Sequence, residues 1–143
     1  MVEISYHLAD IETLPFQGLE QKYSHWLEKV AIVENVTILN LTYIFCSDEY
    51  LLDINIKYLE HDYYTDIITF PYKEGQEIEA DLYISVDRVK ENADEFNVDF
   101  HNELNRVMVH GFLHLIGYKD KTADDVALMR SKEDLYLSTF DTM

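Results

Sequence analysis

The run HGFLHLIGYKD holds the residues whose types and spacing could do chemistry. It places His110 four residues before His114, and Asp120 follows Gly117 at its end. On a helix, residues i and i+4 share one face with Cβ atoms about 5 to 6 Å apart, so both imidazoles can reach one metal ion. Glycine adopts the left-handed backbone conformation at little cost, so we expect Gly117 to end the helix and the turn to present Asp120 as a third ligand.

Three protein ligands predict a catalytic metal site rather than a structural one. A tetrahedral ion with three protein ligands keeps one open position, where water or substrate binds. We therefore expect one divalent metal ion, with zinc preferred, on His110, His114 and Asp120. The alternative is a buried helix with two core histidines and an ordinary glycine cap. The offsets of the glycine and the aspartate favour the metal site, because chance seldom places both after a histidine pair in a chain with four glycines.

The residue after the first histidine bears on the reaction. Zinc peptidases of the HExxH type use the glutamate at that position as the general base, whereas this chain has Gly111 there. A peptidase mechanism is therefore not expected, while phosphodiester hydrolysis depends less on that glutamate because a metal site can itself supply the nucleophile. Glycine within a helix costs about 1 kcal/mol relative to alanine. We expect Gly111 either to let a substrate or another backbone approach the metal or to allow tight helix packing.

Alternating helical and extended segments must position these residues. Apolar residues at helical spacing predict helices at residues 17–33, 48–59, 86–96, 100–116 and 122–139, with Ser47 as an N-cap and a capping box at Thr122. Alternation and β-branched residues predict strands at 37–46, 66–70 and 81–85, with residues 72–79 as a loop. The helix at 100–116 is apolar on nearly all of its surface and belongs in the middle of the molecule. We expect an α+β fold of helices packed on a small mixed sheet.

Length and composition limit the class of protein. The 143 residues fit one domain, which we place at residues 1–143, and 48% hydrophobic residues are enough for a packed core. Cys46 is the only cysteine, so no intrachain disulfide can form, and we expect a buried thiol in a reducing cytoplasm. The start, MVEISYHLADIE, is acidic where a signal peptide is basic, and no run reaches about 18 apolar residues. We expect a cytoplasmic protein without a membrane partner.

The charge of the chain argues against a general nucleic-acid binder. A net charge of −17 leaves no broad basic face for binding nucleic acid, so no DNA partner is expected. A polyanion would therefore have to be bound by a few basic side chains close to the expected metal site. Arg106, Lys119 and Lys121 lie close in sequence to the expected ligands. The alternative for these cations is surface solvation or pairing with Glu103 and the acidic pair at 124 and 125.

Several segments resemble the YbeY family of bacterial endoribonucleases. The run VHGFLHLIGYKD looks like the family pattern HGxLHLxGYDH, which has three histidine ligands. TDIITFP at residues 65–71 is similar to the family's TDVLSFP, and ADLYIS at residues 80–85 is similar to its GDIxIS strand. Further matches are Asn55 and Tyr58 of an N-x-x-Y-R segment and, in the C-terminal helix, Met129 and Glu133. Together these matches span roughly residues 36 to 135.

The resemblance implies a zincin-like α+β domain and a single-strand-specific, metal-dependent endoribonuclease of ribosomal RNA maturation and ribosome quality control. The expected partner is ribosomal RNA within ribosomal particles. A ribosomal or basic protein would add affinity, since a net charge of −17 gains little from counterion release. Two alternatives stay open, namely a non-catalytic ribosome-assembly factor stapled by the metal and a metal-dependent hydrolase of another small substrate. The metal site of such an assembly factor should be closed to solvent, whereas the metal site of an enzyme needs an open position lined by a cleft.

Two positions depart from the family pattern. The third histidine falls on Asp120, so the site would hold two imidazoles and a carboxylate, which is a harder ligand. The arginine that the family is thought to use for the scissile phosphate falls on Leu59, which cannot pair with an anion. Arg106, on the ligand face of its helix, is our candidate for the phosphate contact. Lys57 and His61 flank the vacant position.

Overall fold

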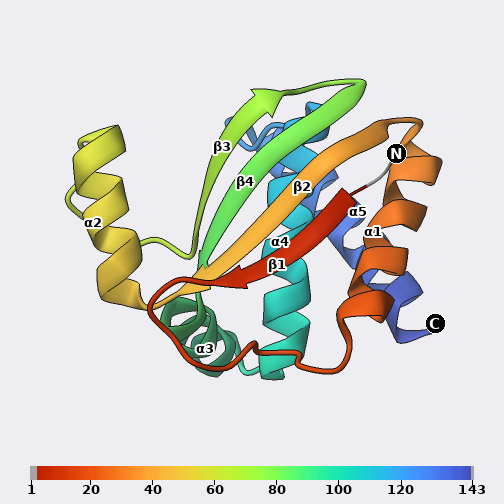
Figure 1. Ribbon diagram of the computed structural model, residues 1–143. Helices are drawn as coiled ribbons and strands as arrows, with labels where there is room; N and C mark the ends of the chain where they lie inside the picture. Colours follow the sequence, from red (N-terminus) through yellow and green to blue (C-terminus); the bar gives the residue numbers. More distant parts are fainter. Residues whose placement is uncertain (1–2, 143) are drawn as a thin grey trace.

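Hydrophobic periodicity predicts most of the elements that the protein forms. The computed structural model describes residues 3–142. These residues form five helices and four strands (Figure 1). In chain order the elements are β1 (Glu3–Leu8), α1 (Glu20–Glu34), β2 (Thr37–Cys46), α2 (Asp48–Leu59), β3 (Ile67–Lys73), β4 (Glu77–Ser85), α3 (Val86–Phe96), α4 (Phe100–Ile116) and α5 (Ala123–Asp141).

The four strands form one mixed sheet in the order β1-β2-β4-β3. Strand β2 pairs in parallel with both β1 and β4, while β3 pairs antiparallel with β4 (Figure 1). Along the central strand β4, buried residues alternate with half-buried ones, as expected for a strand with one face on the main core. The predicted α+β class with a small mixed sheet is confirmed.

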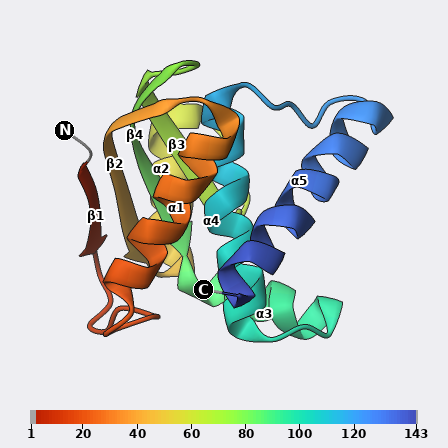
Figure 2. The ribbon, with the colours of Figure 1, turned by 90° about the vertical axis from the view of Figure 1, so that its right-hand side faces the viewer.

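Helix α4 occupies the middle of the molecule, as its apolar surface predicts. Figure 2 shows the sheet, then α1 and α4, then α5 as successive layers. Helix α4 contacts β3 and β4 on one side and α5 on the other, and most of its residues are buried. Among residues 3–142, no helix combines the length and the apolar character needed to cross a membrane, α4 included.

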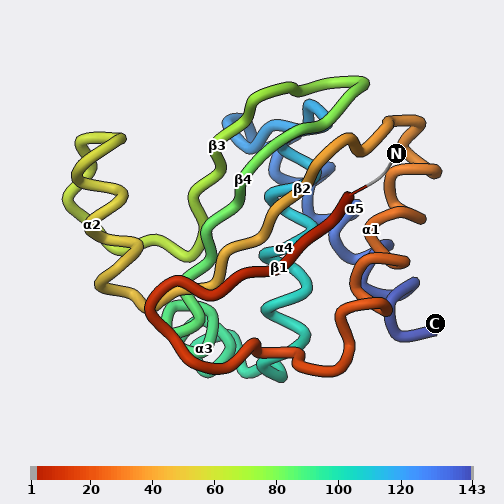
Figure 3. Tube along the Cα trace, in the orientation of Figure 1, coloured from red at the N-terminus to blue at the C-terminus, as the bar shows by residue number. Residues whose placement is uncertain are grey.

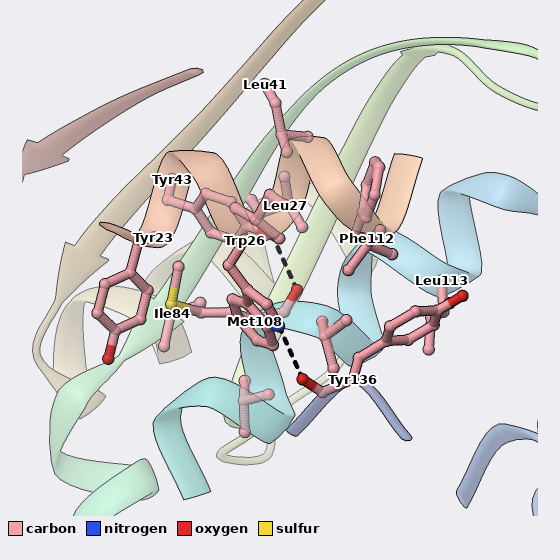
Figure 4. Packing of buried hydrophobic residues seen from close by; sticks show 14 of the residues in the cluster. Tyr23, Trp26, Leu27, Leu41, Tyr43, Ile84, Met108, Phe112, Leu113 and Tyr136 are labelled. Atoms are coloured by element: carbon pink, nitrogen blue, oxygen red, sulfur yellow. Dashed lines mark hydrogen bonds between the residues drawn. The ribbon is translucent and has the colours of Figure 1, made fainter. Parts of the chain in front are cut away.

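The core between these layers is filled by aromatic and aliphatic side chains (Figure 4). Trp26 Nε1 on α1 donates a hydrogen bond to the carbonyl oxygen of Tyr136 on α5 at 2.8 Å. Tyr43 Oη on β2 donates to the carbonyl oxygen of Met108 on α4 at 2.9 Å. A buried donor without an acceptor costs about 1–3 kcal/mol, so these two bonds fix α5 and α4 against the rest of the core.

Helix α2 packs outside the main core. Its trace stands apart from α1, α4 and α5 in Figure 3. Leu51 of α2 joins a small separate cluster with Cys46 and Ile68. Cys46 is buried, as predicted, and burial raises the pKa of its thiol to about 12. The thiol is therefore protonated and unreactive at neutral pH.

Three helix ends follow the signals predicted from the sequence. Ser47 accepts a hydrogen bond from the backbone N–H of Tyr50 at the start of α2. Thr122 and Asp125 form the predicted capping box at the start of α5. Gly117 ends α4 with a φ of 129°, a backbone angle that favours glycine. The chain can therefore turn sharply after the second histidine.

Several predicted boundaries are wrong. No strand is predicted at Glu3–Leu8, where β1 pairs with β2. The predicted loop at residues 72–79 is mostly strand, because β3 and β4 continue as an antiparallel pair to Lys73 and Glu79. Helix α1 begins at Glu20 rather than at residue 17, since the chain before it forms turns, and α5 continues two residues past 139. These strand boundaries depend on pairing between residues far apart in sequence.

Candidate metal centre

Helix α4 and the turn after it bring the three sequence-predicted ligands together. The Nε2 atoms of His110 and His114 lie 3.0 Å apart. Oδ2 of Asp120 lies 3.3 Å from His114 Nε2 and 3.8 Å from His110 Nε2. One nitrogen or oxygen atom from each residue thus falls within 4.8 Å of the other two.

The hydrogen bonds of the two rings leave both Nε2 atoms free to bind a cation. His110 Nδ1 lies 2.6 Å from Oε2 of Glu133, and His114 Nδ1 lies 2.9 Å from the carbonyl oxygen of Tyr118. Since a carboxylate and a carbonyl are acceptors, each Nδ1 carries the hydrogen, and each Nε2 presents a lone pair. Two facing lone pairs beside the Asp120 carboxylate repel one another unless a cation lies between them. The donor set therefore fits a divalent ion.

The separations also fit the size of such an ion. Zinc binds imidazole nitrogen at about 2.0–2.1 Å, which puts neighbouring ligand atoms of a tetrahedron about 3.3 Å apart. The three separations of 3.0, 3.3 and 3.8 Å bracket that value. Two imidazoles and one carboxylate are also acceptable to other first-row divalent ions, so the geometry favours a metal of this class rather than one element.

A cavity of about 340 Å³ opens beside His110 and Asp120. Its walls come from β3, α3, α4 and α5. The His110 and His114 side chains keep 28% and 34% of their surface exposed, and the Asp120 side chain keeps 49%. The site is therefore open on one side, as an enzyme needs and as a closed structural staple would not be.

Glu133 on α5 contacts the Nδ1 side of His110, opposite the Nε2 atom that faces His114 and Asp120. Its side chain is buried, and its two oxygens accept hydrogen bonds from His110 Nδ1 at 2.6 Å and from Arg106 Nη1 at 2.8 Å. Burial raises the pKa of Glu133, but the bonds from His110 and Arg106 lower it further, so the carboxyl is ionised. A carboxylate behind a metal-binding histidine fixes the tautomer and the direction of the ring. From the sequence, Glu133 stands out only as a family match, and no local pattern predicts its contact with His110, because α5 packs on α4 through tertiary structure.

The turn that carries Asp120 is tied to α1. Tyr118 Oη donates a hydrogen bond to Glu34 Oε1 at 2.6 Å, and Glu34 also accepts from Tyr136 and Lys132. Burial raises the pKa of Glu34, but the hydrogen bonds from the two tyrosines and the charge of Lys132 lower it further. The resulting carboxylate anchors Tyr118, whose carbonyl oxygen orients His114.

Two arginines line the cavity beside the triad. Arg106 is held by two carboxylates of α5, with Nη1 at 2.8 Å from Glu133 Oε1 and Nη2 at 2.7 Å from Asp134 Oδ1. The alternative pairing with Glu103 is therefore wrong, since the partners come from α5. The Arg130 side chain is 60% exposed and has a longer contact of 3.7 Å to Glu133 Oε1. Arg130 thus keeps more of its donors free than Arg106.

The other basic residues that the sequence suggests for phosphate binding lie elsewhere. Lys57 lines a separate hollow with Tyr58 on α2. His61 Nδ1 is bonded to Tyr63 Oη at 3.0 Å. Neither of these two side chains lines the cavity beside His110, and Lys119 and Lys121 are exposed in the turn. The structure therefore does not bring the residues flanking Leu59 to the triad.

Gly111 faces the sheet rather than the cavity. A Cβ atom at this position would lie 2.6 Å from Ile67 Cδ1 and 2.7 Å from Leu82 Cδ2. Both contacts are far shorter than van der Waals separation, so the Ile67 and Leu82 side chains would have to move for a larger residue to fit, and the close packing of α4 on β3 and β4 favours glycine here. Of the two explanations offered from the sequence, tight helix packing is confirmed and close approach of a substrate is wrong.

The fold and the site define a class of protein: a single α+β unit with two histidines and an aspartate, suited to a divalent ion, at the edge of an open cavity. The family model described as Endoribonuclease YbeY matches residues 4–141. The chain belongs to this family, which makes it an endoribonuclease, a hydrolase of phosphodiester bonds in RNA. The resemblance noted from the motifs is confirmed and extends over nearly the whole chain.

Individual relatives agree with the family match. Endoribonuclease YbeY of Flavobacterium psychrophilum is 54% identical over 121 residues, covering 85% of this chain and 86% of that protein. Endoribonuclease YbeY of Cytophaga hutchinsonii is 55% identical over 114 residues, covering 79% of this chain and 80% of that protein. The solution structure of TM1509 from Thermotoga maritima superposes with a TM-score of 0.69 at 29% identity, covering 95% of this chain and 88% of that one.

Proposed function

We propose that residues 1–143 act as one metal-dependent endoribonuclease domain that cuts single-stranded ribosomal RNA during ribosome maturation and quality control. The observation that carries the proposal is the convergence of His110, His114 and Asp120 at the edge of an open cavity. Family membership supports the nuclease activity. The restriction to single strands and to ribosomal RNA follows the motif resemblance and belongs to the proposal.

In this proposal the three residues hold one divalent ion, with zinc preferred. When bound, such an ion polarises a phosphoryl oxygen and lowers the pKa of water at the open position. The side chains of the protein orient the two imidazole rings. Glu133 holds His110 and the carbonyl of Tyr118 holds His114, so that both Nε2 atoms face the same point. Such supporting contacts restrict the rings to the geometry that binds the ion.

Arg106 and Arg130 are the proposed phosphate contacts. Both line the cavity together with His110 and Asp120. Arg106 is held in a fixed position by Glu133 and Asp134, whereas the exposed Arg130 can turn toward an entering phosphodiester. Guanidinium groups suit this task because their planar donors match phosphate oxygens in pairs. Together these two side chains take over the role that Leu59 cannot perform.

The net charge of −17 bears on how the substrate arrives. General RNA binding depends on releasing counterions from phosphates through many basic side chains, which this chain lacks. We infer that ribosomal particles, or a basic ribosomal protein within them, supply much of the affinity. The proposed place of action is the cytoplasm, with no DNA or membrane partner.

The experiment compares cleavage of precursor ribosomal RNA as naked RNA and in assembled particles. The expected result is cleavage in particles that a chelator and His110→Ala both abolish, with much slower cleavage of naked RNA. His25→Ala, which removes an exposed histidine of α1, serves as the matched control and should cleave normally. Cleavage that survives chelation and loss of His110 would refute metal dependence. No cleavage in any sample, with metal and ribosome binding intact, would instead indicate an assembly factor.

A further inference from the structure

The cavity beside the triad extends along α4 beyond the three expected ligands. Four residues of this helix line it at the i, i+3, i+4 and i+7 spacing of a single helix face, namely Glu103, Arg106, Val107 and His110. A helix rises about 1.5 Å per residue, so the stretch from His110 back to Glu103 spans about 10 Å. A cavity of about 340 Å³ with this reach is larger than a phosphate group needs.

Helix α3 forms the wall of the cavity next to the start of α4. The two helices contact each other and are connected only by residues 97–99. Figure 2 shows α3 beside the first turns of α4. Phe96, the last residue of α3, and Asn92, one helical turn before it, both line the cavity. Phe96 therefore lies toward the Glu103 end of the cavity rather than at the proposed ligands.

Phe96 continues the apolar face of α3 but is not buried. Val89 and Ala93 of that face are buried, and Phe96 follows them at the i+7 and i+3 spacing of the same face. Phe96 is nevertheless 59% exposed, because it reaches the wall of the cavity rather than the core. It thus presents the flat face of an aromatic ring to a molecule that enters the cavity.

The basic side chains of the cavity gather around the Glu133 carboxylate of α5. His110, Arg106 and Arg130 have nitrogen atoms 2.6, 2.8 and 3.7 Å from its oxygens. The two residues of α3 that line the cavity are uncharged. A phosphodiester is therefore attracted to the α5 side, whereas the α3 side suits a neutral group with a flat apolar face.

RNA offers both kinds of group within one nucleotide. The ribose joins each charged phosphate to a base that is neutral and has two flat faces. Bases of single strands stack on aromatic side chains, and each such stack adds to the affinity. A nucleotide with its phosphate near the two arginines can therefore extend its base toward Phe96.

We propose that Phe96 is the base-stacking residue of the site, on which the base next to the scissile phosphate lies flat. This inference rests on the proposed function and supplies a physical basis for its restriction to single strands. A base in a duplex is paired and stacked between its neighbours, so its face cannot reach Phe96. An unpaired base can turn out of its strand and stack on the ring. Because every base has such a face, the contact selects unpaired nucleotides rather than a sequence.

The test measures single-turnover cleavage of ribosomal particles at increasing concentrations of the metal-loaded protein. Phe96→Ala should raise the protein concentration needed for half of the maximal rate by about tenfold or more, because one base loses its stacking partner. The metal content and the rate at saturation should stay unchanged, since the ring holds the base and not the scissile phosphate. An unchanged half-maximal concentration would contradict the proposal.

Two further variants separate stacking from simple apolar contact. Phe96→Trp keeps an aromatic face and should restore most of the affinity, whereas Phe96→Leu keeps an apolar side chain without a ring and should not. Both keep an apolar group at the end of α3 and serve even if Phe96→Ala does not fold. Tyr72→Ala removes an exposed ring of β3 that does not line the cavity and is the matched control. Equal affinity in Phe96→Leu and the unaltered protein would overturn the assignment.

A fluorescence readout separates this inference from the proposed function. The probe is a short single-stranded RNA that carries a fluorescent purine analogue whose emission depends on stacking. Saturating protein should change that emission, and both Phe96→Leu and annealing of a complementary strand should remove most of the change. No change, or a change that Phe96→Leu leaves intact, overturns the inference even if RNA is cleaved. A change that depends on Phe96, in a protein that cleaves no RNA, would refute the proposed function while the base contact stands.

Discussion

His110 Nδ1 lies 2.6 Å from Oε2 of Glu133, although 23 residues separate them in the chain. The contact joins the centre of α4 to the middle of α5. Because Glu133 is buried and ionised, it fixes the hydrogen of His110 on Nδ1 and turns Nε2 toward His114 and Asp120. The last helix therefore takes part in the site without supplying a ligand.

Removing the charge of Glu133 should weaken metal binding. Glu133→Gln keeps an acceptor for His110 but loses the charge that strengthens the imidazole as a ligand, so metal affinity should fall by about 10–100-fold. Competition with a chromophoric chelator measures this. Asp134→Asn is the control, since Asp134 bonds to Arg106 but not to His110. Equal affinity in Glu133→Gln and the unaltered protein would show that the contact is only structural.

The proposed ligands can be tested by elemental analysis. His114→Ala and Asp120→Ala should each hold much less than one equivalent of metal, because each removes one of three converging atoms. In the unaltered protein, metal affinity should fall as the pH drops through the pKa of His110, which burial lowers but the contact with Glu133 raises above the ordinary imidazole value, since histidine must be neutral to ligate. If both variants keep a full equivalent, the site assignment fails.

The two cavity arginines should contribute to RNA binding. Arg106→Ala and Arg130→Ala should each weaken particle-bound RNA binding by about tenfold, the loss of one charge-assisted hydrogen bond, with unchanged metal content. Arg130→Lys should recover part of the loss. Lys121→Ala, which removes an exposed cation outside the cavity, is the control. RNA affinity that is unaffected by both alanine variants would mean that a partner holds the phosphate.

Adding a methyl group at Gly111 should destabilise the fold. In Gly111→Ala the new Cβ would press on Ile67 and Leu82, and such overpacking costs about 1–3 kcal/mol, partly offset by about 1 kcal/mol of helix propensity. Denaturant unfolding measures the net change. Adding Ile67→Val, which removes the nearest methyl group, should restore part of the stability. A Gly111→Ala protein more stable than the parent would contradict the packing explanation.

The stability that Glu34 contributes to the turn carrying Asp120 should depend on pH. Because the net pKa shift of Glu34 is downward, its carboxylate contributes stability that is present above its ordinary value of 4.5 and is lost as the pH falls below that value. Glu34→Gln should therefore lower the free energy of unfolding by about 1–2 kcal/mol at neutral pH, and the difference should shrink in acid. Unfolding curves at several pH values test this. A difference that is constant down to strong acid would show that Glu34 does not act through its charge.

The sequence by itself determined the features that depend on short separations along the chain. His110, His114, Gly117 and Asp120 come together because an i, i+4 pair shares a helix face and a glycine ends that helix one turn before the aspartate. The caps at Ser47 and Thr122 were predictable for the same reason, since each bonds to a backbone N–H three residues away. The helical segments followed from the period of their apolar residues.

Only the tertiary structure decided what surrounds those residues. The contacts of Glu133 with His110, of Arg106 with Asp134 and of Tyr118 with Glu34 join residues 23, 28 and 84 positions apart. No local pattern specifies such pairs, because they form only when helices pack on one another and on the sheet. Strand β1 was missed for the same reason, since a strand acquires its hydrogen bonds from a partner elsewhere in the chain. Packing of distant elements around α4 therefore sets the charges, the open side and the shape of the cavity.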